Sequence, residues 1–340
     1  MNSIRIRRHE VTFQPQSARV ILRPFIPGNG PIIASILNRA LAMSEADVEA
    51  QLLTLHEEFA SRHFEVEPLL IANYEKVRSH LSPKVPLTRV RQLLIGALFS
   101  GEYALESAAL FNPSMVPHPD QSGVPAGGLR FVMSLRATGE GHISSIEFRT
   151  GIVSPEGSIQ VDPVSRFVTM PDVVPNPSYL KRRFSAKIDE MGFEAAHTTP
   201  VMDLLADRFT LQELDESLRR VRRESKPVSR ELRRALEVFR WLAESNYELN
   251  FPARLAMSER IIFPVSPNES NGIEDARFVR FTDDDGSVIY YATYTAYNGR
   301  SILPQFIETQ VFLHFRVLTL NGSGVQNKGM AMFPRRIGGR

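Results

Sequence analysis

Two stretches of the chain, residues 110–170 and 247–333, consist of short runs of β-forming residues that Gly, Pro and Asp separate. This texture is typical of a β-meander, in which neighbouring strands pair through tight turns. With 340 residues the chain can bury a large core. We therefore expect a mainly β protein made of repeated small sheets, which are either blades of a propeller or halves of a sandwich.

Helical patterns precede the first of these stretches and separate it from the second. Ser44 and Asp47 resemble a capping box at the start of an apolar helical pattern. Residues 204–221 and 232–242 form two further amphipathic stretches. The expected parts are an N-terminal strand and helical region (1–100), first blades (101–174), a helical insertion (175–246) and further blades (247–340).

The composition is that of a soluble globular protein, with 43% hydrophobic residues and a net charge of +2. The chain has no cysteine, which excludes disulfides, thiolate metal sites and cysteine nucleophiles. No apolar run approaches the length of a membrane span. We expect a cytoplasmic protein that has no membrane partner and that can form a homo-oligomer.

Residues 219–234 contain a run of arginines that at first resembles a nucleic-acid patch. Glutamates and aspartates are interleaved on the same helical stretches. This pattern favours a solvated face on which the arginines form salt bridges, and we expect no nucleic-acid partner.

Glu274, Asp275 and Arg277 lie in a Gly-led turn that precedes a strand rich in tyrosine. If the segment is extended, Asp275 and Arg277 point to the same side. An acid beside a fixed cation, close to aromatic rings, suits acid catalysis on a sugar. The alternative is a loop acid that caps the turn and pairs with Arg277.

Two other groups of polar or charged residues could bind a ligand. Asn112 and Arg136 are polar residues at strand ends in apolar surroundings. Lys328, Arg335 and Arg336, with glycines nearby, could bind an oxyanion such as phosphate, or could form a basic tail. His118 and His142 lack a third ligand at metal-like spacing, so we interpret them as turn or core histidines and expect no metal site.

These three groups, in this order, resemble glycoside hydrolase family 130, the inverting mannoside phosphorylases and related mannosidases. The resemblance covers residues 100–170 and 247–340. Its specific part is the central block of Glu274, Asp275 and Arg277 together with the strand that contains Tyr294. The matching segments are Phe111-Asn112-Pro113-Ser114, Ser134-Leu135-Arg136, Gly272-Ile273-Glu274-Asp275-Ala276-Arg277, Tyr291 to Gly299, and Lys328 to Arg340.

The resemblance implies a five-bladed β-propeller whose catalytic acid is Asp275. Asp275 would protonate the glycosidic oxygen of a β-mannoside, while inorganic phosphate, the co-substrate, attacks the anomeric carbon from the opposite face. The product would be α-mannose 1-phosphate, and no cofactor is implied. Because phosphate is already an anion, this mechanism needs no second carboxylate, whereas an inverting hydrolase does.

The resemblance also assigns the surrounding residues. Asn112 and Arg136 match positions that hold the sugar. We also expect Glu274 and Arg277, which flank the acid, to contact the substrate. The remaining matches are Tyr297 and Asn298, which would close the site near the phosphate, and Lys328, Arg335 and Arg336, which would bind it.

In one respect the chain departs from the family. Members continue beyond the C-terminal motif for about two more blades, whereas this chain ends at Arg340. We therefore expect an incomplete propeller of about three blades and a poor or inactive catalyst. A β-mannosidase of the same fold and a non-catalytic carbohydrate-binding propeller are the alternatives.

Overall fold

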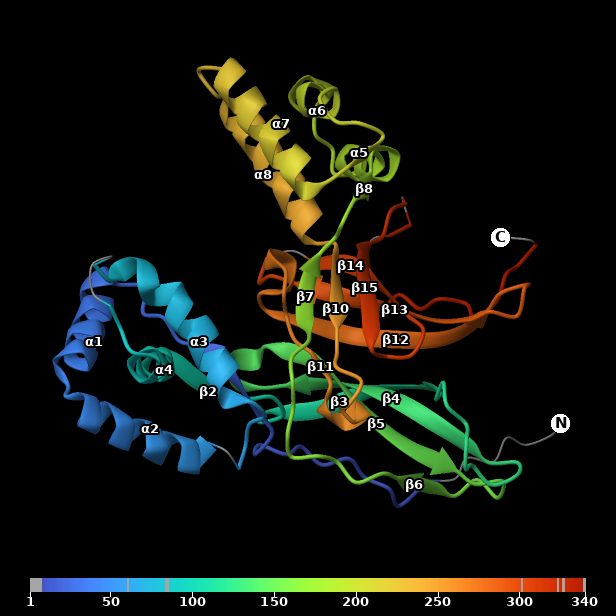
Figure 1. The fold of residues 1–340 in the computed structure, drawn as a ribbon. Helices are drawn as coiled ribbons and strands as arrows, with labels where there is room; N and C mark the ends of the chain where they lie inside the picture. The colour runs from blue at the N-terminus through green and yellow to red at the C-terminus, as the bar shows by residue number, and fades with distance from the viewer. Residues whose placement is uncertain are drawn as a thin grey trace.

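The computed structural model describes residues 8–59, 61–82, 86–300, 302–322, 324–325 and 328–338. It is mainly β, with one large sheet and two groups of helices (Figure 1). The prediction of a mainly β protein with additional helices is therefore confirmed. The C-terminal Gly339 and Arg340 lie outside the described residues.

The large sheet has eleven strands in two groups. The first group contains β3 (Ala109–Pro117), β4 (Leu129–Thr138) and β5 (Ser144–Val153), with β6 (Ile159–Val161) and β11 (Ile261–Ile262) paired to β5. The second follows the order β12 (Gly272–Thr282), β13 (Val288–Tyr297), β14 (Ile302–Thr309), β15 (His314–Thr319), β10 (Tyr247–Asn250) and β7 (Asp172–Pro175). Strand pairing among the described residues runs from β3 to β7 and does not close on itself.

A single parallel pair, Gly272 with Ser144, joins the two groups of strands. Gly272 has a φ of 133°, and a Cβ on it would lie 2.7 Å from the backbone nitrogen of Ser144. Only glycine allows the two backbones to approach this closely. The ends of β3, β4, β5 and β12 consequently meet at this join.

The first group of helices lies beside the sheet and contains α1 (Gly30–Ala42), α2 (Glu45–Phe59), α3 (Val66–Val77), η1 (Arg78–His80) and α4 (Arg89–Leu98). The hairpin of β1 (Val20–Pro24) and β2 (Ser100–Ala104) connects it to the sheet region. The predicted cap of α2 is present, because the Asp47 amide donates to Ser44 Oγ at 3.2 Å.

The second group of helices stands away from the sheet at the top of Figure 1. It contains α5 (Lys181–Glu190), α6 (Ala195–Met202), α7 (Leu211–Glu224) and α8 (Arg230–Glu244), with the small β8 (Tyr179–Leu180) and β9 (Arg208–Phe209) pair. Short 3-10 turns complete the structure at η2 (Glu140–His142), η3 (Met257–Glu259) and η4 (Pro267–Glu269). No helix in the described ranges has both the length and the apolar character needed to cross a bilayer.

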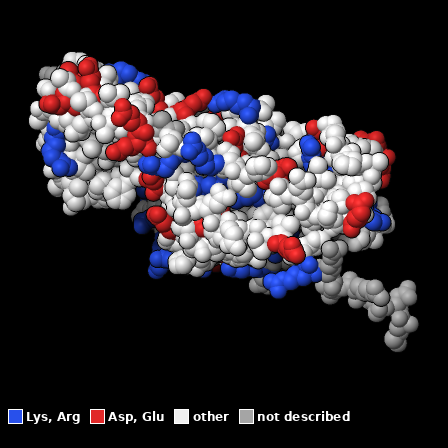
Figure 2. Space-filling model, turned by 90° about the horizontal axis from the view of Figure 1, so that it is seen from below, with Lys and Arg blue, Asp and Glu red and all other residues white. Residues whose placement is uncertain are grey.

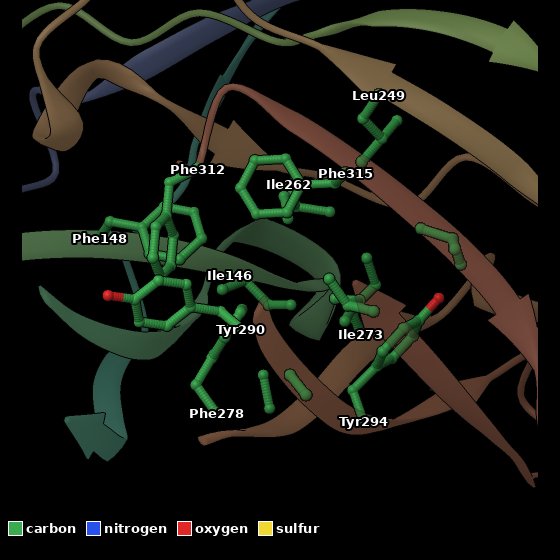
Figure 3. Close-up of a cluster of buried hydrophobic side chains, with 14 of the residues drawn as sticks. Ile146, Phe148, Leu249, Ile262, Ile273, Phe278, Tyr290, Tyr294, Phe312 and Phe315 are labelled. Carbon is green, nitrogen blue, oxygen red and sulfur yellow. The ribbon is translucent and has the colours of Figure 1, made fainter. Parts of the chain in front are cut away.

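The main core gathers buried side chains from both groups of strands and is rich in aromatic rings (Figure 3). Along β13, Tyr290, Ala292, Tyr294 and Ala296 point into it, as the period of two in a strand requires. The helices at 181–244 have a separate core around Phe239. The amphipathic faces thus build a second hydrophobic centre away from the sheet.

A buried cluster of four charges fastens the N-terminal segment to β5. Arg19 contacts Glu106 at 2.8 Å and Glu147 at 2.7 Å, and Arg149 contacts the same two carboxylates at 2.7 and 3.1 Å. The four side chains are at most 2% exposed. Burial and the nearby charge of Glu147 raise the pKa of Glu106 to about 7.

Candidate active site

Two β-bulges face each other where β3 and β12 meet. Pairing slips between Phe111 and Ser114 on β3, and between Glu274 and Arg277 on β12. The residues inside the bulges, Asn112 and Asp275, have φ values of 51° and 55°. Asn and Asp tolerate this left-handed region better than most residues. Bulges change the direction in which side chains point, and here they turn the side chains of Asn112 and Asp275 toward each other.

The two re-aimed side chains are in contact. Asn112 Nδ2 donates a hydrogen bond to Asp275 Oδ1. Arg136 on β4 donates from Nη1 to the same oxygen at 3.3 Å and from Nη2 to Glu274 Oε1 at 2.9 Å. Residues up to 163 positions apart in the sequence therefore form one cluster.

Arg136 is fixed by neighbours that the sequence analysis did not assign to the site. Its Nε donates to Ser144 Oγ at 2.9 Å, and its guanidinium lies 5.0 Å from the centre of the Phe111 ring. Phe111 belongs to a recognised motif, but only its place next to Asn112 hints at this contact. Ser144 lies eight positions further along, on the strand β5 that pairs with β4, so this contact follows from the register of that hairpin, which the sequence pattern alone does not fix.

Lys328 approaches the cluster from the C-terminal segment. Its Nζ lies 2.7 Å from Glu274 Oε2 and 5.2 Å from the centre of the Tyr297 ring. Both oxygens of Glu274 are thus bound to cations, one by Arg136 and one by Lys328. Asp275 remains more open, with 28% of its side chain exposed against 11% for Glu274.

Arg277 does not pair with Asp275. The expectation that the two side chains point to the same side is therefore wrong, and so is the alternative of a turn acid bound to Arg277. The bulge breaks the extended geometry on which that pairing depends. Arg277 Nη1 instead lies 3.4 Å from the carbonyl oxygens of Asn112 and Pro113. It makes no ion pair with any carboxylate of the described chain.

Tyr297 and Asn298 lie at the end of β13, beside the start of β12. The Tyr297 carbonyl accepts a hydrogen bond from the Asn271 amide at 2.9 Å, and its ring faces Lys328. Asn298 Oδ1 accepts from the Arg300 amide at 3.0 Å. Tyr297 therefore borders the cluster, and Asn298 shapes the turn that follows it.

The structure does not bring Arg335 and Arg336 to this cluster. Arg336 pairs at 2.8 Å with Asp283, which follows the opposite end of β12, roughly 25 Å along the strand from Asp275. Arg335 lies near the Phe333 ring at 6.0 Å. Both line a cleft of about 1050 Å³ between the strands β12–β15 and α5, a cleft that Asp275 does not line.

The two singled-out histidines lie in turns. Burial lowers the pKa of His118, whose Nδ1 accepts a hydrogen bond from the Asp120 amide at 3.0 Å. His142 is the last residue of η2 and has a φ of 61°. Among the described residues no group of three His, Cys, Asp or Glu is arranged to hold a metal.

On the face shown in Figure 2, positive and negative side chains are interspersed. The candidate site follows the same balance on a smaller scale, because Arg136 and Lys328 offset Glu274 and Asp275. A neutral ligand with many hydroxyl groups matches such a mixture of donors and acceptors.

Comparisons with protein-family models, with curated proteins and with solved structures gave no match. Membership of glycoside hydrolase family 130 accordingly stays a prediction that rests on the quoted motifs.

Proposed function

We propose that the cluster around Asp275 binds a β-mannoside and cleaves it by phosphorolysis. Asp275 donates its proton to the glycosidic oxygen while an oxygen of inorganic phosphate bonds to the anomeric carbon from the opposite face. The bond from the anomeric carbon to the glycosidic oxygen breaks, which releases the shortened sugar and α-mannose 1-phosphate. Asp275 then recovers a proton from the solvent.

The observation that carries this proposal is the contact between Asn112 and Asp275, both in left-handed backbone conformation. Backbone strain of this kind is concentrated at functional sites. It is maintained here by two bulges on different strand groups. An amide, a guanidinium and a carboxylate at one partly exposed point give the fixed donors and acceptors that orient a sugar.

Phosphorolysis fits the cluster better than hydrolysis does. An inverting hydrolase needs a second carboxylate that is free to activate water. The nearest candidate, Glu274, has both oxygens engaged by Arg136 and Lys328. Arg277 makes no ion pair in the described chain, and Lys328 is 50% exposed beside Glu274, so these two cations would attract phosphate. Arg335 and Arg336 line a different cleft and would have to move to reach it.

The finer architecture is part of the proposal. We infer that β3–β6 and β12–β15 belong to successive blades of a β-propeller, with β12 beginning at the join. Support comes from the single pair that connects the two strand groups and from the position of the cluster at their junction. The propeller would place this junction at its central channel.

The test is product analysis after long incubation with β-mannobiose, with and without phosphate. We expect slow release of mannose 1-phosphate that depends on phosphate and persists in Glu274→Gln, a variant that keeps the shape of the side chain. Release of free mannose at the same rate without phosphate would favour the hydrolase. Sugar binding without any product would favour a carbohydrate-binding protein.

A further inference from the structure

The hairpin formed by α7 and α8 carries a concentrated positive charge at its tip. Residues 219–234, which span the end of α7, the loop and the start of α8, contain eight Lys and Arg against two Glu. Acidic residues are more frequent in the other half of each helix, at Glu213, Asp215 and Glu216 on α7 and at Glu237 and Glu244 on α8. The hairpin is therefore basic at its tip and more acidic toward its base.

Most of these arginines are not in salt bridges, and the expectation of a salt-bridged face is wrong for them. Arg220 pairs with Glu224 at 2.9 Å, as expected for residues four apart. No carboxylate of the described chain lies within 4.0 Å of Arg222, Arg223, Arg230 or Arg233. The interleaved acids are in the sequence, but the hairpin places most of them nearer its base.

Folding of the hairpin does not account for the arginines on α8. The positive end of a helix dipole lies at the N-terminus, where cations are unfavourable. Arg230, Arg233 and Arg234 nonetheless occupy the start of α8, which Ser229 caps through the Leu232 amide at 3.0 Å. An intramolecular role is visible only for Arg234, whose guanidinium lies 5.9 Å from the centre of the Phe193 ring.

A groove runs along the hairpin beside these charges. It has a volume of about 730 Å³. Its apolar lining comes from Leu218, Val228, Leu236 and Trp241, and its basic lining from Arg219, Arg222, Arg233 and Arg240. Tryptophan and arginine are the side chains most enriched where protein partners bind tightly.

The position of the hairpin leaves the tip accessible. Figure 1 shows the loop between α7 and α8 at the end of the helical group that is farthest from the sheet. Arg222, Arg223, Arg230 and Arg233 are all exposed. The tip can therefore be contacted without disturbing the sheet or the candidate active site.

We propose that the tip and the groove bind an acidic amphipathic segment of a partner protein. Its carboxylates would pair with the free arginines, and an apolar side chain would enter the groove beside Trp241. Asp215, Glu237 and Glu244 also line the groove. Arg240 pairs with Asp215 at 3.5 Å and with Glu244 at 2.8 Å, so the groove itself has mixed charge. A peptide of mixed character fits such a groove better than the uniform phosphates of nucleic acid or an anionic membrane.

Trp241 is the only tryptophan of the chain, so its fluorescence reports on the groove. The probe is a tryptophan-free helical peptide of about 18 residues with a Glu face and a Leu face. We expect a saturable shift of Trp241 emission with this peptide and none with its Lys-for-Glu twin. The double variant Arg222→Glu, Arg233→Glu should weaken binding at least about tenfold.

The matched control is Arg39→Glu, Arg89→Glu, which changes the net charge equally at exposed arginines of the N-terminal helices. It should bind the peptide as the unmodified chain does, and thermal melts should show that both variants are folded. Equal weakening in both variants would overturn the proposal. So would the absence of a shift at about 1 mM peptide, or tighter binding of a single-stranded oligonucleotide or of phosphatidylglycerol vesicles.

Discussion

Two clusters in this protein have the same composition, two carboxylates and two cations, but differ in burial and backbone geometry. In the buried cluster, Arg19, Glu106, Glu147 and Arg149 are at most 2% exposed. In the candidate site, Lys328 is 50% exposed and Asp275 is 28% exposed. Asp275 also has the left-handed conformation that a bulge imposes.

The difference separates a structural clamp from a site that can accept a ligand. Charges sealed from water must satisfy one another, because an unpaired charge in the interior is very unfavourable. At the partly open junction, Asp275 and Lys328 keep exposed surface that a sugar or phosphate can contact. Equal composition therefore does not imply equal function, and the following variants test this distinction.

The largest stability effect is expected in the buried cluster. Arg149→Met leaves Glu106 and Glu147 with only Arg19, and should lower the free energy of unfolding by about 3–5 kcal/mol. Arg136→Met in the candidate site should cost clearly less, because its side chain is partly exposed. Urea denaturation of both variants measures the contrast, and similar losses would remove the distinction between the clusters.

The pH dependence of stability should also come from the buried cluster. The pKa of Glu106 is about 7 in the folded chain against an ordinary 4.5, so the folded state binds more protons between these values. The stability that protonated Glu106 contributes to the folded state is complete below pH 4.5 and is lost as the pH rises through 7. Glu106→Gln should flatten the decline, which is on the order of a few kcal/mol. Unfolding at pH 4.5 and 7 checks this, and an unchanged slope would contradict the assignment.

Glu147 should act in a separate pH range. Burial opposes its ionisation, but Arg19 and Arg149 together lower its pKa below the ordinary 4.5. The stability it contributes is present above pH 4.5 and is lost in more acidic solution. In the Glu106→Gln variant the loss of stability in acidic solution should remain, because it comes from Glu147. This result distinguishes the two carboxyl groups.

The backbone at Asn112 gives a smaller effect. Its φ of 51° suits glycine better than alanine. The free energy of unfolding of Asn112→Gly should therefore be about 1–2 kcal/mol higher than that of Asn112→Ala, although both variants lose the contact with Asp275. Thermal denaturation of the pair measures the difference. Equal stability would mean that the bulge does not hold this residue in the left-handed region in solution.

The smallest effect is expected at Lys328. Its pair with Glu274 is half exposed, so Lys328→Ala should change stability by less than about 1 kcal/mol. Under the proposed function the same variant should weaken the dependence of product release on phosphate. A large loss of stability would place Lys328 in a structural role instead.

Local signals in the sequence predicted the helices well where a cap was present. Ser44 caps α2, which begins at Glu45, but the stretch that we assigned as one helix from 204 to 221 begins only after Thr210. Thr210 and Glu213 form a capping box, a signal that the sequence contains and that periodicity alone obscured. The apolar residues before it lie in the turn that follows α6 and in β9.

Five residues chosen from the sequence lie together in the structure, namely Asn112, Arg136, Glu274, Asp275 and Lys328. Their roles in a site stay predictions. Which cation holds Asp275 was not predictable, since the bulge turns Asp275 away from Arg277 and toward Arg136. The contact of Arg19 with Glu147 spans 128 positions and follows from no local pattern.

The most direct test of the account is a paired measurement on Asp275→Asn. We expect this variant to keep the stability of the unmodified chain within about 1 kcal/mol, because Asn can still accept from Asn112 and Arg136. Its phosphate-dependent release of mannose 1-phosphate from β-mannobiose should fall by about 10²–10⁴-fold. Unchanged release, or unfolding of the variant, would contradict the assignment of Asp275 as a catalytic acid.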